Sequence, residues 1–151
     1  MTERTWRVYL AGEIHSDWRD RVEQACEGLP ITFTAPVTDH PASDAAGTST
    51  LGDEEKKFWA DHKGAGVNSI RTQTFIQDAD VVVVRFGDKY RQWNAAFDAG
   101  YASALGKPVI TQHDEELDHA LKEVDAAARA TARTPEQVGA VLRYVITGSL
   151  P

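Results

Sequence analysis

Residues 81–86 form an almost unbroken apolar run, Val-Val-Val-Val-Arg-Phe, in which four β-branched residues follow one another. Such a run is typical of a strand that is covered on both faces, because a strand with one face in water alternates apolar and polar side chains. Strands of this kind occur almost only in parallel sheets that carry helices on both sides. The run therefore predicts an α/β protein.

The rest of the chain alternates between β-prone and helical patterns. The further β-prone runs are residues 6–11, 31–35, 108–111 and 130–132. The helical patterns cover residues 18–29, 68–78, 93–105, 117–128 and a last helix that opens with Thr134-Pro135-Glu136-Gln137, a capping box. Strands alternating with helices imply right-handed crossovers. The sequence predicts a three-layer, doubly wound parallel sheet of about five strands, flavodoxin-like or Rossmann-like.

The 151 residues correspond to the usual size of one domain, so we expect a single domain over residues 1–151. Residues 36–66 show no periodicity and are rich in Pro, Gly, Ser, Thr, Asp and His. We predict a long loop there, which could contain a short helix around residues 54–60. A connection of this length is more often a binding loop or a lid than an accident.

The charge balance bears on the partners of the chain. Sixteen Lys and Arg stand against 23 Asp and Glu, a net charge of −7, which repels a phosphate backbone and excludes nucleic acid as the expected partner. No stretch approaches the roughly 20 apolar residues that span a bilayer, and the N-terminus lacks the apolar run of a signal peptide. We predict a cytoplasmic protein without membrane contact. The single cysteine, Cys26, falls on an apolar helix stripe and is predicted to lie in the core.

Signatures of common cofactors are missing. Gly12 has no second and third glycine for a dinucleotide fingerprint, and no Gly-rich stretch precedes a Lys-Ser or Lys-Thr pair. None of the five histidines has the short spacing of a metal-chelating pair. We expect no cofactor and no metal. A metal-dependent hydrolase is the least supported alternative, and it would draw on Asp39, His40, Asp44 and Asp53.

Polar and aromatic residues gather where the predicted strands end, which is where doubly wound sheets bind ligands. The first group follows the opening strand, which itself contains Tyr9, and consists of Gly12, Glu13, His15 and Asp17. The second group follows the valine run and consists of Phe86, Gly87, Asp88, Gln92, Trp93 and Asn94. Aromatic rings at strand ends can stack on a planar base, although packing in the core is an equally good interpretation of Phe86 and Trp93.

Asp98 lies one turn beyond Asn94 in the helix that begins near Trp93. The helix macrodipole favours a carboxylate near the N-terminus and is expected to keep Asp98 ionised. An ionised, positioned carboxylate is what a glycosyl-transferring nucleophile must be. The alternative is that Asp98 only satisfies the helix terminus while Asn94 caps it.

These segments resemble the nucleoside 2-deoxyribosyltransferase superfamily, and over nearly its full length the chain is similar to the small YtoQ family. The similarity is carried by five strings, Tyr9-Leu-Ala-Gly-Glu-Ile-His-Ser-Asp-Trp-Arg19, Pro30-Ile-Thr-Phe33, Phe86-Gly-Asp-Lys-Tyr-Arg-Gln-Trp-Asn94, Asp98-Ala-Gly-Tyr-Ala102 and Gly106-Lys-Pro108. In the enzymes of the superfamily a carboxylate attacks the anomeric carbon of a nucleoside, releases the base and holds the sugar until another base or water accepts it. The resemblance places Asp98 at the nucleophile and Tyr9 at the residue that orients it. It also implies a homo-oligomer, because these enzymes complete their sites across subunit contacts.

The chain departs from the superfamily pattern at three positions. Asp98 replaces a Glu that is one methylene longer, Gln92 replaces an Asp that assists the leaving base, and Asn94 replaces a Gly. Gln92 can hydrogen-bond a base but cannot protonate it. Help to the leaving group must then come from another residue, and the candidates are Asp88, Asp17, Glu13 and His15.

Three hypotheses about function remain open. The first is N-glycosyl transfer or hydrolysis on a nucleoside, a nucleotide or a related ribosyl compound. The second is a non-catalytic module that binds a nucleotide or sugar nucleotide, motivated by the missing Glu and the missing second Asp. The third adds a phosphorylated ligand, held by helix amides near Asn68 and Asn94 or by Arg71, Lys89 or Arg91.

Overall fold

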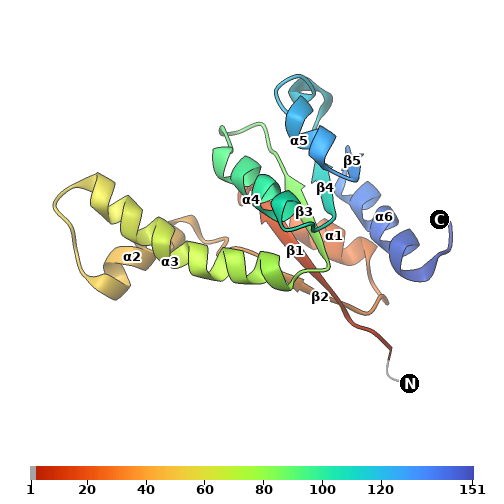
Figure 1. Cartoon of the computed structure of the whole chain (residues 1–151), viewed down its shortest axis with the longest axis horizontal. Coiled ribbons are helices and arrows are strands. Elements are labelled where there is room, and N and C mark those ends of the chain that lie inside the picture. Colours follow the sequence, from red (N-terminus) through yellow and green to blue (C-terminus); the bar gives the residue numbers. More distant parts are fainter. Residues whose placement is uncertain (1–2) are drawn as a thin grey trace.

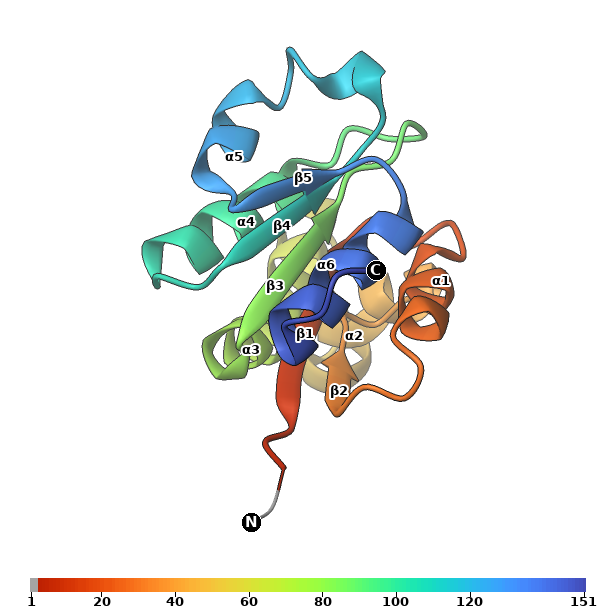
Figure 2. The same ribbon diagram turned by 90° about the vertical axis from the view of Figure 1, so that its right-hand side faces the viewer.

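The computed structural model describes residues 3–151 and contains one sheet of five strands. All neighbouring strands pair in parallel, in the order β2-β1-β3-β4-β5 (Figure 2). The strands are β1 (Trp6–Gly12), β2 (Ile31–Thr34), β3 (Val81–Arg85), β4 (Val109–Gln112) and β5 (Ala130–Ala132). This confirms the predicted doubly wound class, and the strand order is the flavodoxin-like one, which reverses between β1 and β3.

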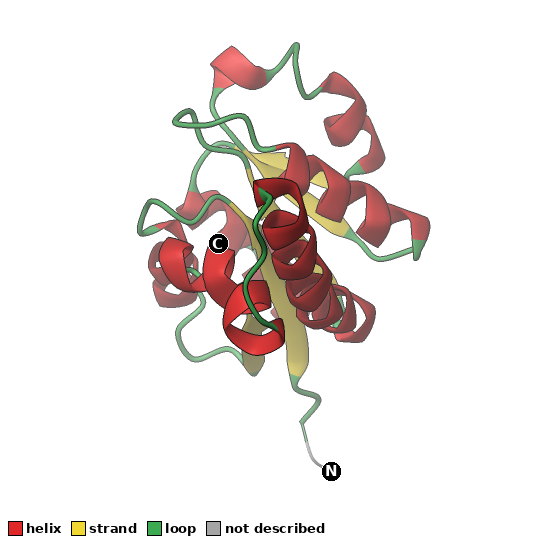
Figure 3. Ribbon diagram, turned by 90° about the vertical axis from the view of Figure 1, so that its left-hand side faces the viewer, coloured by secondary structure: helices red, strands yellow, loops and turns green. Residues whose placement is uncertain are grey.

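Helices cover both faces of the sheet (Figure 3). One face carries α1 (Trp18–Ala25) and α6 (Pro135–Thr147), and the other carries α3 (Lys57–Asp78), α4 (Trp93–Ala104) and α5 (Lys122–Ala127). Successive residues of the strands point to opposite faces, so Val8 and Leu10 pack under α1 and α6 while Tyr9 and Ala11 pack under α3 and α4. The buried apolar run of β3 supplies side chains to both cores, as the sequence predicted.

The prediction of a loop over residues 36–66 is wrong. The segment forms α2 (His40–Leu51) and the first part of α3, and the two helices pair as an arm that projects beside the sheet (Figure 1). Their contact is close because Gly47 meets Gly64: a Cβ added to Gly47 would lie 2.2 Å from the Gly64 nitrogen. Asn68 therefore lies inside α3 instead of capping it, and its amide donates to the Ser43 carbonyl at 3.0 Å.

The last third of the chain follows the prediction with one difference. The expected helix over residues 117–128 is divided into a short 3-10 helix, η1 (Glu115–Leu117), and α5. The edge strand β5 forms where predicted, and the Thr134 hydroxyl accepts a hydrogen bond from the Gln137 amide at 3.1 Å, which caps α6.

Gly12 ends β1 at the point where the strand order reverses. It pairs with Arg85 of β3, its φ is +113°, and an added Cβ would lie 2.1 Å from the Arg85 carbonyl oxygen. Only glycine fits this position, because an L side chain would be both strained and in collision with the neighbouring strand. The predicted ligand-binding role of Gly12 is untested, whereas its structural role is evident.

Among residues 3–151, no helix is both long enough and apolar enough to cross a membrane.

Candidate functional site

Tyr9 is fully buried in β1 on the face covered by α3 and α4, and its ring lies 6.2 Å from that of Phe75. Within the described residues its hydroxyl forms no hydrogen bond of normal geometry, although Thr72 lies near it. Burial, with a smaller contribution from the nearby Asp98 carboxylate, raises the pKa of Tyr9 to about 12. At neutral pH the hydroxyl is a neutral donor whose hydrogen bond is free for a ligand or for Asp98.

Asp98 lies on α4, which packs on β1, and its side chain is largely but not fully buried. Desolvation by burial raises the pKa of Asp98 to about 6. The macrodipole therefore does not dominate, contrary to the expectation from sequence. The reason is position: α4 starts at Trp93, which places Asp98 in the second turn, and the dipole effect fades beyond the first turn. The carboxylate is still mostly ionised at pH 7 and is a competent base or nucleophile.

Asn94 does not cap α4. The cap position is Gln92, whose side-chain oxygen accepts from the Gly87 amide at 2.8 Å and closes the loop between β3 and α4. Phe86 is 5% exposed and belongs to the core, so it offers no open stacking wall in this conformation. Trp93 is 71% exposed, with the Arg91 guanidinium 5.9 Å from its ring, and it remains a candidate for stacking.

Glu13 is buried within the loop that follows β1. Its carboxylate accepts from the His15 amide at 2.6 Å, from the amide and hydroxyl of Ser16, and from the Arg85 side chain at 2.9 Å. Burial by itself would raise the pKa of Glu13, but the bonds from Ser16, His15 and Arg85 hold it below its usual range. A carboxylate that stays ionised in this way is poorly suited to donate a proton to a leaving base.

Three rings from three segments that are distant in the chain lie close together beyond the carboxyl ends of the strands. The His15 ring lies 4.9 Å from that of Tyr90 and 5.8 Å from that of His40, which begins α2. Asp17 and Asp88 are exposed in the loops that follow β1 and β3, and Asp17 occupies the cap position of α1 without a side-chain hydrogen bond. His15 and Asp88 remain the candidates for assisting the leaving base.

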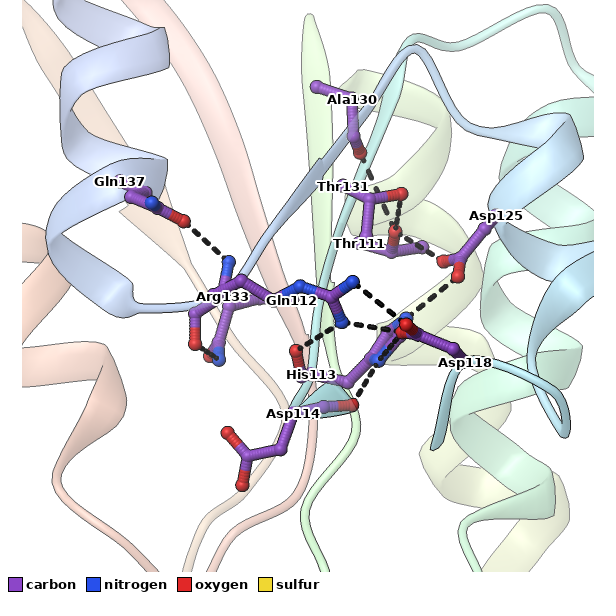
Figure 4. A network of polar contacts seen from close by, with 10 residues as sticks. All are labelled: Thr111, Gln112, His113, Asp114, Asp118, Asp125, Ala130, Thr131, Arg133 and Gln137. Carbon is purple, nitrogen blue, oxygen red and sulfur yellow. Dashed lines mark hydrogen bonds and ion pairs between the residues drawn. The ribbon is translucent and has the colours of Figure 1, made fainter. Parts of the chain in front are cut away.

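Sequence reasoning missed a polar network around His113 at the end of β4 (Figure 4). The fully buried His113 ring contacts the Asp125 carboxylate at 2.8 Å and the Asp114 carbonyl at 2.9 Å. Asp125 also accepts from the Thr111 hydroxyl at 2.7 Å. The network connects α5 to the sheet. Its residues are far apart in the chain, so no local sequence motif indicates it.

Asp118 completes the acidic side of this network, and His113, Asp118 and Asp125 lie close enough together to hold a metal ion. Arg133 already forms a two-point ion pair with Asp118, at 2.5 and 3.0 Å. A cation therefore balances Asp118 from within the chain, which makes a structural role the better interpretation of the cluster.

Comparison with solved structures defines the class of fold. The chain resembles the 2-deoxyribosyltransferase of Bacillus psychrosaccharolyticus with a TM-score of 0.57 and 19% identity, covering 88% of this chain and 90% of the other. A conserved protein of Enterococcus faecalis V583 gives a TM-score of 0.53 and 13% identity, covering 90% and 96% of the two chains. The fold is flavodoxin-like, as in nucleoside 2-deoxyribosyltransferases.

Comparison of sequences defines the family. Residues 9–146 match the family model described as nucleoside 2-deoxyribosyltransferase YtoQ. The uncharacterized protein YtoQ of Bacillus subtilis (strain 168) is 42% identical over 140 residues, which cover 91% of this chain and 95% of that protein. The chain belongs to the YtoQ family, and the resemblance stated from its motifs is confirmed.

Proposed function

We propose that the chain transfers or hydrolyses the N-glycosidic bond of a nucleoside, a nucleotide or a related ribosyl compound, with Asp98 as the nucleophile. The observation that carries the proposal is the proximity of two groups, the buried Tyr9 hydroxyl on β1, which has no hydrogen-bond partner, and the largely buried Asp98 carboxylate on α4, which interacts with it electrostatically. Buried polar groups without partners are rare and call for a functional explanation. Family membership supports the same chemistry.

In the proposed first step an Asp98 oxygen attacks the anomeric carbon of the sugar. The bond from that carbon to the base nitrogen breaks, its electron pair leaves with the base, and the base takes a proton from solvent, His15 or Asp88. In the second step water or another base attacks the same carbon, the ester to Asp98 breaks, and the carboxylate is restored. Tyr9 stays neutral and donates its hydrogen bond to Asp98 or to the sugar.

The direct test mixes the protein with a panel of ribonucleosides and deoxyribonucleosides and measures free base by chromatography. We expect release by the wild type and none by Asp98→Asn, which keeps the shape of the side chain but removes the nucleophile. The matched control is Asp78→Asn, which makes the same change at an exposed carboxylate at the end of α3 and is expected to retain release. Equal release by wild type and Asp98→Asn would remove Asp98 from the mechanism.

One observation favours the second candidate function, a binding module without turnover. Gln92 is committed to the Gly87 amide and is an amide where an acid would assist the leaving base. A ligand that raises the melting temperature and is recovered intact after long incubation would support binding alone. A covalent sugar adduct would exclude it.

We also propose that the protein forms a homo-oligomer. Support comes from exposed apolar side chains on the outer sides of α3 and α4, namely Ile70, Trp93 and Phe97, which are 71%, 71% and 64% exposed. Gln77 joins the two helices through a 2.7 Å hydrogen bond to the Tyr101 hydroxyl. Light scattering of the wild type and of Phe97→Lys tests this proposal, because the substitution is expected to shift the mass toward a monomer.

A further inference from the structure

A hollow of about 350 Å³ lies at the carboxyl ends of β1 and β2, between α1 and α3. Its walls include Phe33 and Pro36 on the side of β2, Arg71 and Phe75 on α3, and Arg19 on α1. Phe75 also contacts the Tyr9 ring, so the hollow adjoins the proposed catalytic pair without being lined by it.

Arg71 is presented to this hollow with no carboxylate bound to it. Its guanidinium is stacked 4.6 Å from the centre of the Phe75 ring, and within residues 3–151 it forms no ion pair of 4 Å or less. A guanidinium placed over an aromatic ring is held in position, and its N–H donors point outward in its own plane, where they can reach an anion. This is the arrangement in which arginine recognises phosphate bidentately.

Arg19 adds a second, more buried positive charge to the same hollow. Three of its nitrogens donate to main-chain carbonyls of the end of β1, Leu10 at 3.0 Å, Gly12 at 3.2 Å and Glu13 at 2.6 Å. It forms no ion pair with a carboxylate of the described chain either, and desolvation lowers its pKa to about 10. Both guanidiniums lie close enough to Tyr9 to lower the pKa that burial raises.

The hollow is not uniformly basic, because Asp20 and Glu23 line it from α1. Both acids are exposed, so water screens their charges more than that of the largely buried Arg19. Their negative charges reduce the affinity of the hollow for an anion. Removal of one of these charges should therefore increase that affinity.

We propose that this hollow binds the phosphate of a 5′-phosphorylated sugar or nucleoside, with Arg71 in direct contact and Arg19 supplying charge from beneath. The inference rests on the proposed function, because it assumes that the sugar of the same ligand lies toward Asp98. It assigns nucleoside 5′-monophosphates as the preferred substrate class. Among the three basic residues that the sequence offered for binding phosphate, only Arg71 lines the hollow. Lys89 and Arg91 instead stack on Tyr90 and Trp93.

The experiment measures the affinities of ribose 5-phosphate, ribose and inorganic phosphate by calorimetry at two salt concentrations. We expect ribose 5-phosphate to bind at least about tenfold more tightly than ribose, with an advantage that shrinks at high salt. Inorganic phosphate should compete weakly with it. Tighter binding of inorganic phosphate than of ribose 5-phosphate would mean a free-phosphate site and would overturn the assignment to a sugar phosphate.

The variants separate the hollow from general charge effects. Arg71→Gln is expected to abolish the advantage of ribose 5-phosphate over ribose, and Asp20→Asn to increase it. The matched control is Arg91→Gln, which removes another exposed arginine stacked on an aromatic ring and should leave the affinity unchanged. Wild-type affinity in Arg71→Gln, or an equal loss in Arg91→Gln, would overturn the inference.

Base release distinguishes the failure of this inference from that of the proposed function. The phosphate site alone would be excluded if base release depends on Asp98 while the KM for a nucleoside 5′-monophosphate is unchanged in Arg71→Gln. The glycosyl chemistry alone would be excluded if phosphate binding depends on Arg71 but no base is released.

Discussion

The Tyr9 hydroxyl of β1 and the Asp98 carboxylate of α4 lie close enough to interact electrostatically; the hydroxyl is buried without a hydrogen-bond partner, and the carboxylate is largely buried. Each group costs folding free energy in this state, because burial removes water without replacing it. A pair of this kind indicates a site in which stability is sacrificed for function.

Removing the hydroxyl tests this interpretation of Tyr9. Tyr9→Phe keeps the buried ring and deletes a hydroxyl that bonds to nothing, so the free energy of unfolding should stay the same or rise by about 1 kcal/mol. Base release should fall by about 10- to 100-fold, the value of one hydrogen bond to a charged group. Denaturant unfolding and initial rates measure the two effects.

The control for this variant is Tyr101→Phe. It removes a hydroxyl that accepts a hydrogen bond from Gln77 on the outside of α3 and α4. It should lose a little stability and keep its activity. A clear loss of stability in Tyr9→Phe would show that its hydroxyl is satisfied within the protein.

The pKa of Asp98 makes stability depend on pH. Folding raises it from 3.8 to about 6, so between these values the folded state holds the proton more tightly than the unfolded state does. The contribution of Asp98 to stability is therefore intact below about pH 4 and is lost as the pH rises through 6, at a cost of up to about 3 kcal/mol.

Asp98→Asn should accordingly raise the free energy of unfolding at pH 8 and change it little at pH 3.5. Chemical denaturation at the two pH values measures the difference. The control is Glu27→Gln, an exposed carboxylate that should show no such contrast. A stabilisation by Asp98→Asn that is equal at both pH values would mean that burial does not raise the pKa of this group.

The His113 network predicts a loss of stability at a distance from the proposed chemistry. Asp125→Ala leaves the buried His113 ring and the Thr111 hydroxyl without a shared acceptor, and should cost about 1–3 kcal/mol in the free energy of unfolding. Asp114→Ala removes a neighbouring exposed carboxylate and is the matched control. Thermal denaturation of both variants at pH 7 decides whether the network or the mere loss of a charge matters.

The contact between α2 and α3 gives a steric prediction. Gly47→Ala places a methyl group 2.2 Å from the Gly64 nitrogen, so the two helices must separate, at a cost of about 1–3 kcal/mol. Hydrogen exchange should then accelerate over residues 40–64. Gly66→Ala, on α3 and with no atom within 4 Å of the new carbon, should be neutral or stabilising. Equal exchange in the two variants would contradict the close packing.

Most of the fold could be predicted from the sequence, but the arm formed by α2 and α3 could not. The four valines of β3 and the breaks at Pro30 and Gly106 identify strands and helices without tertiary information. The segment of α2 does not, because it is built of Ala, Gly, Ser and Thr and has no apolar stripe. Its helicity depends on the meeting of Gly47 and Gly64, and that contact exists only after folding.

Only part of the candidate site could be predicted from the sequence, because some of its features depend on contacts that form on folding. Asp98 and Tyr9 stand in local motifs, so the sequence could point to them. The sequence suggested no role for Arg19, because that role depends on carbonyls at the end of β1 that the turn brings close to its side chain. The burial that raises the pKa of Asp98 is likewise a property of the packed chain and not of its spacing.

The proposed reaction requires a covalent bond between Asp98 and the sugar. Protein mixed with a reactive nucleoside is quenched in acid, digested and examined by mass spectrometry. We predict a mass increase of one glycosyl group on the peptide that contains Asp98, with none in Asp98→Asn. Release of base by the wild type without this adduct, at a rate that Asp98→Asn retains, would contradict it.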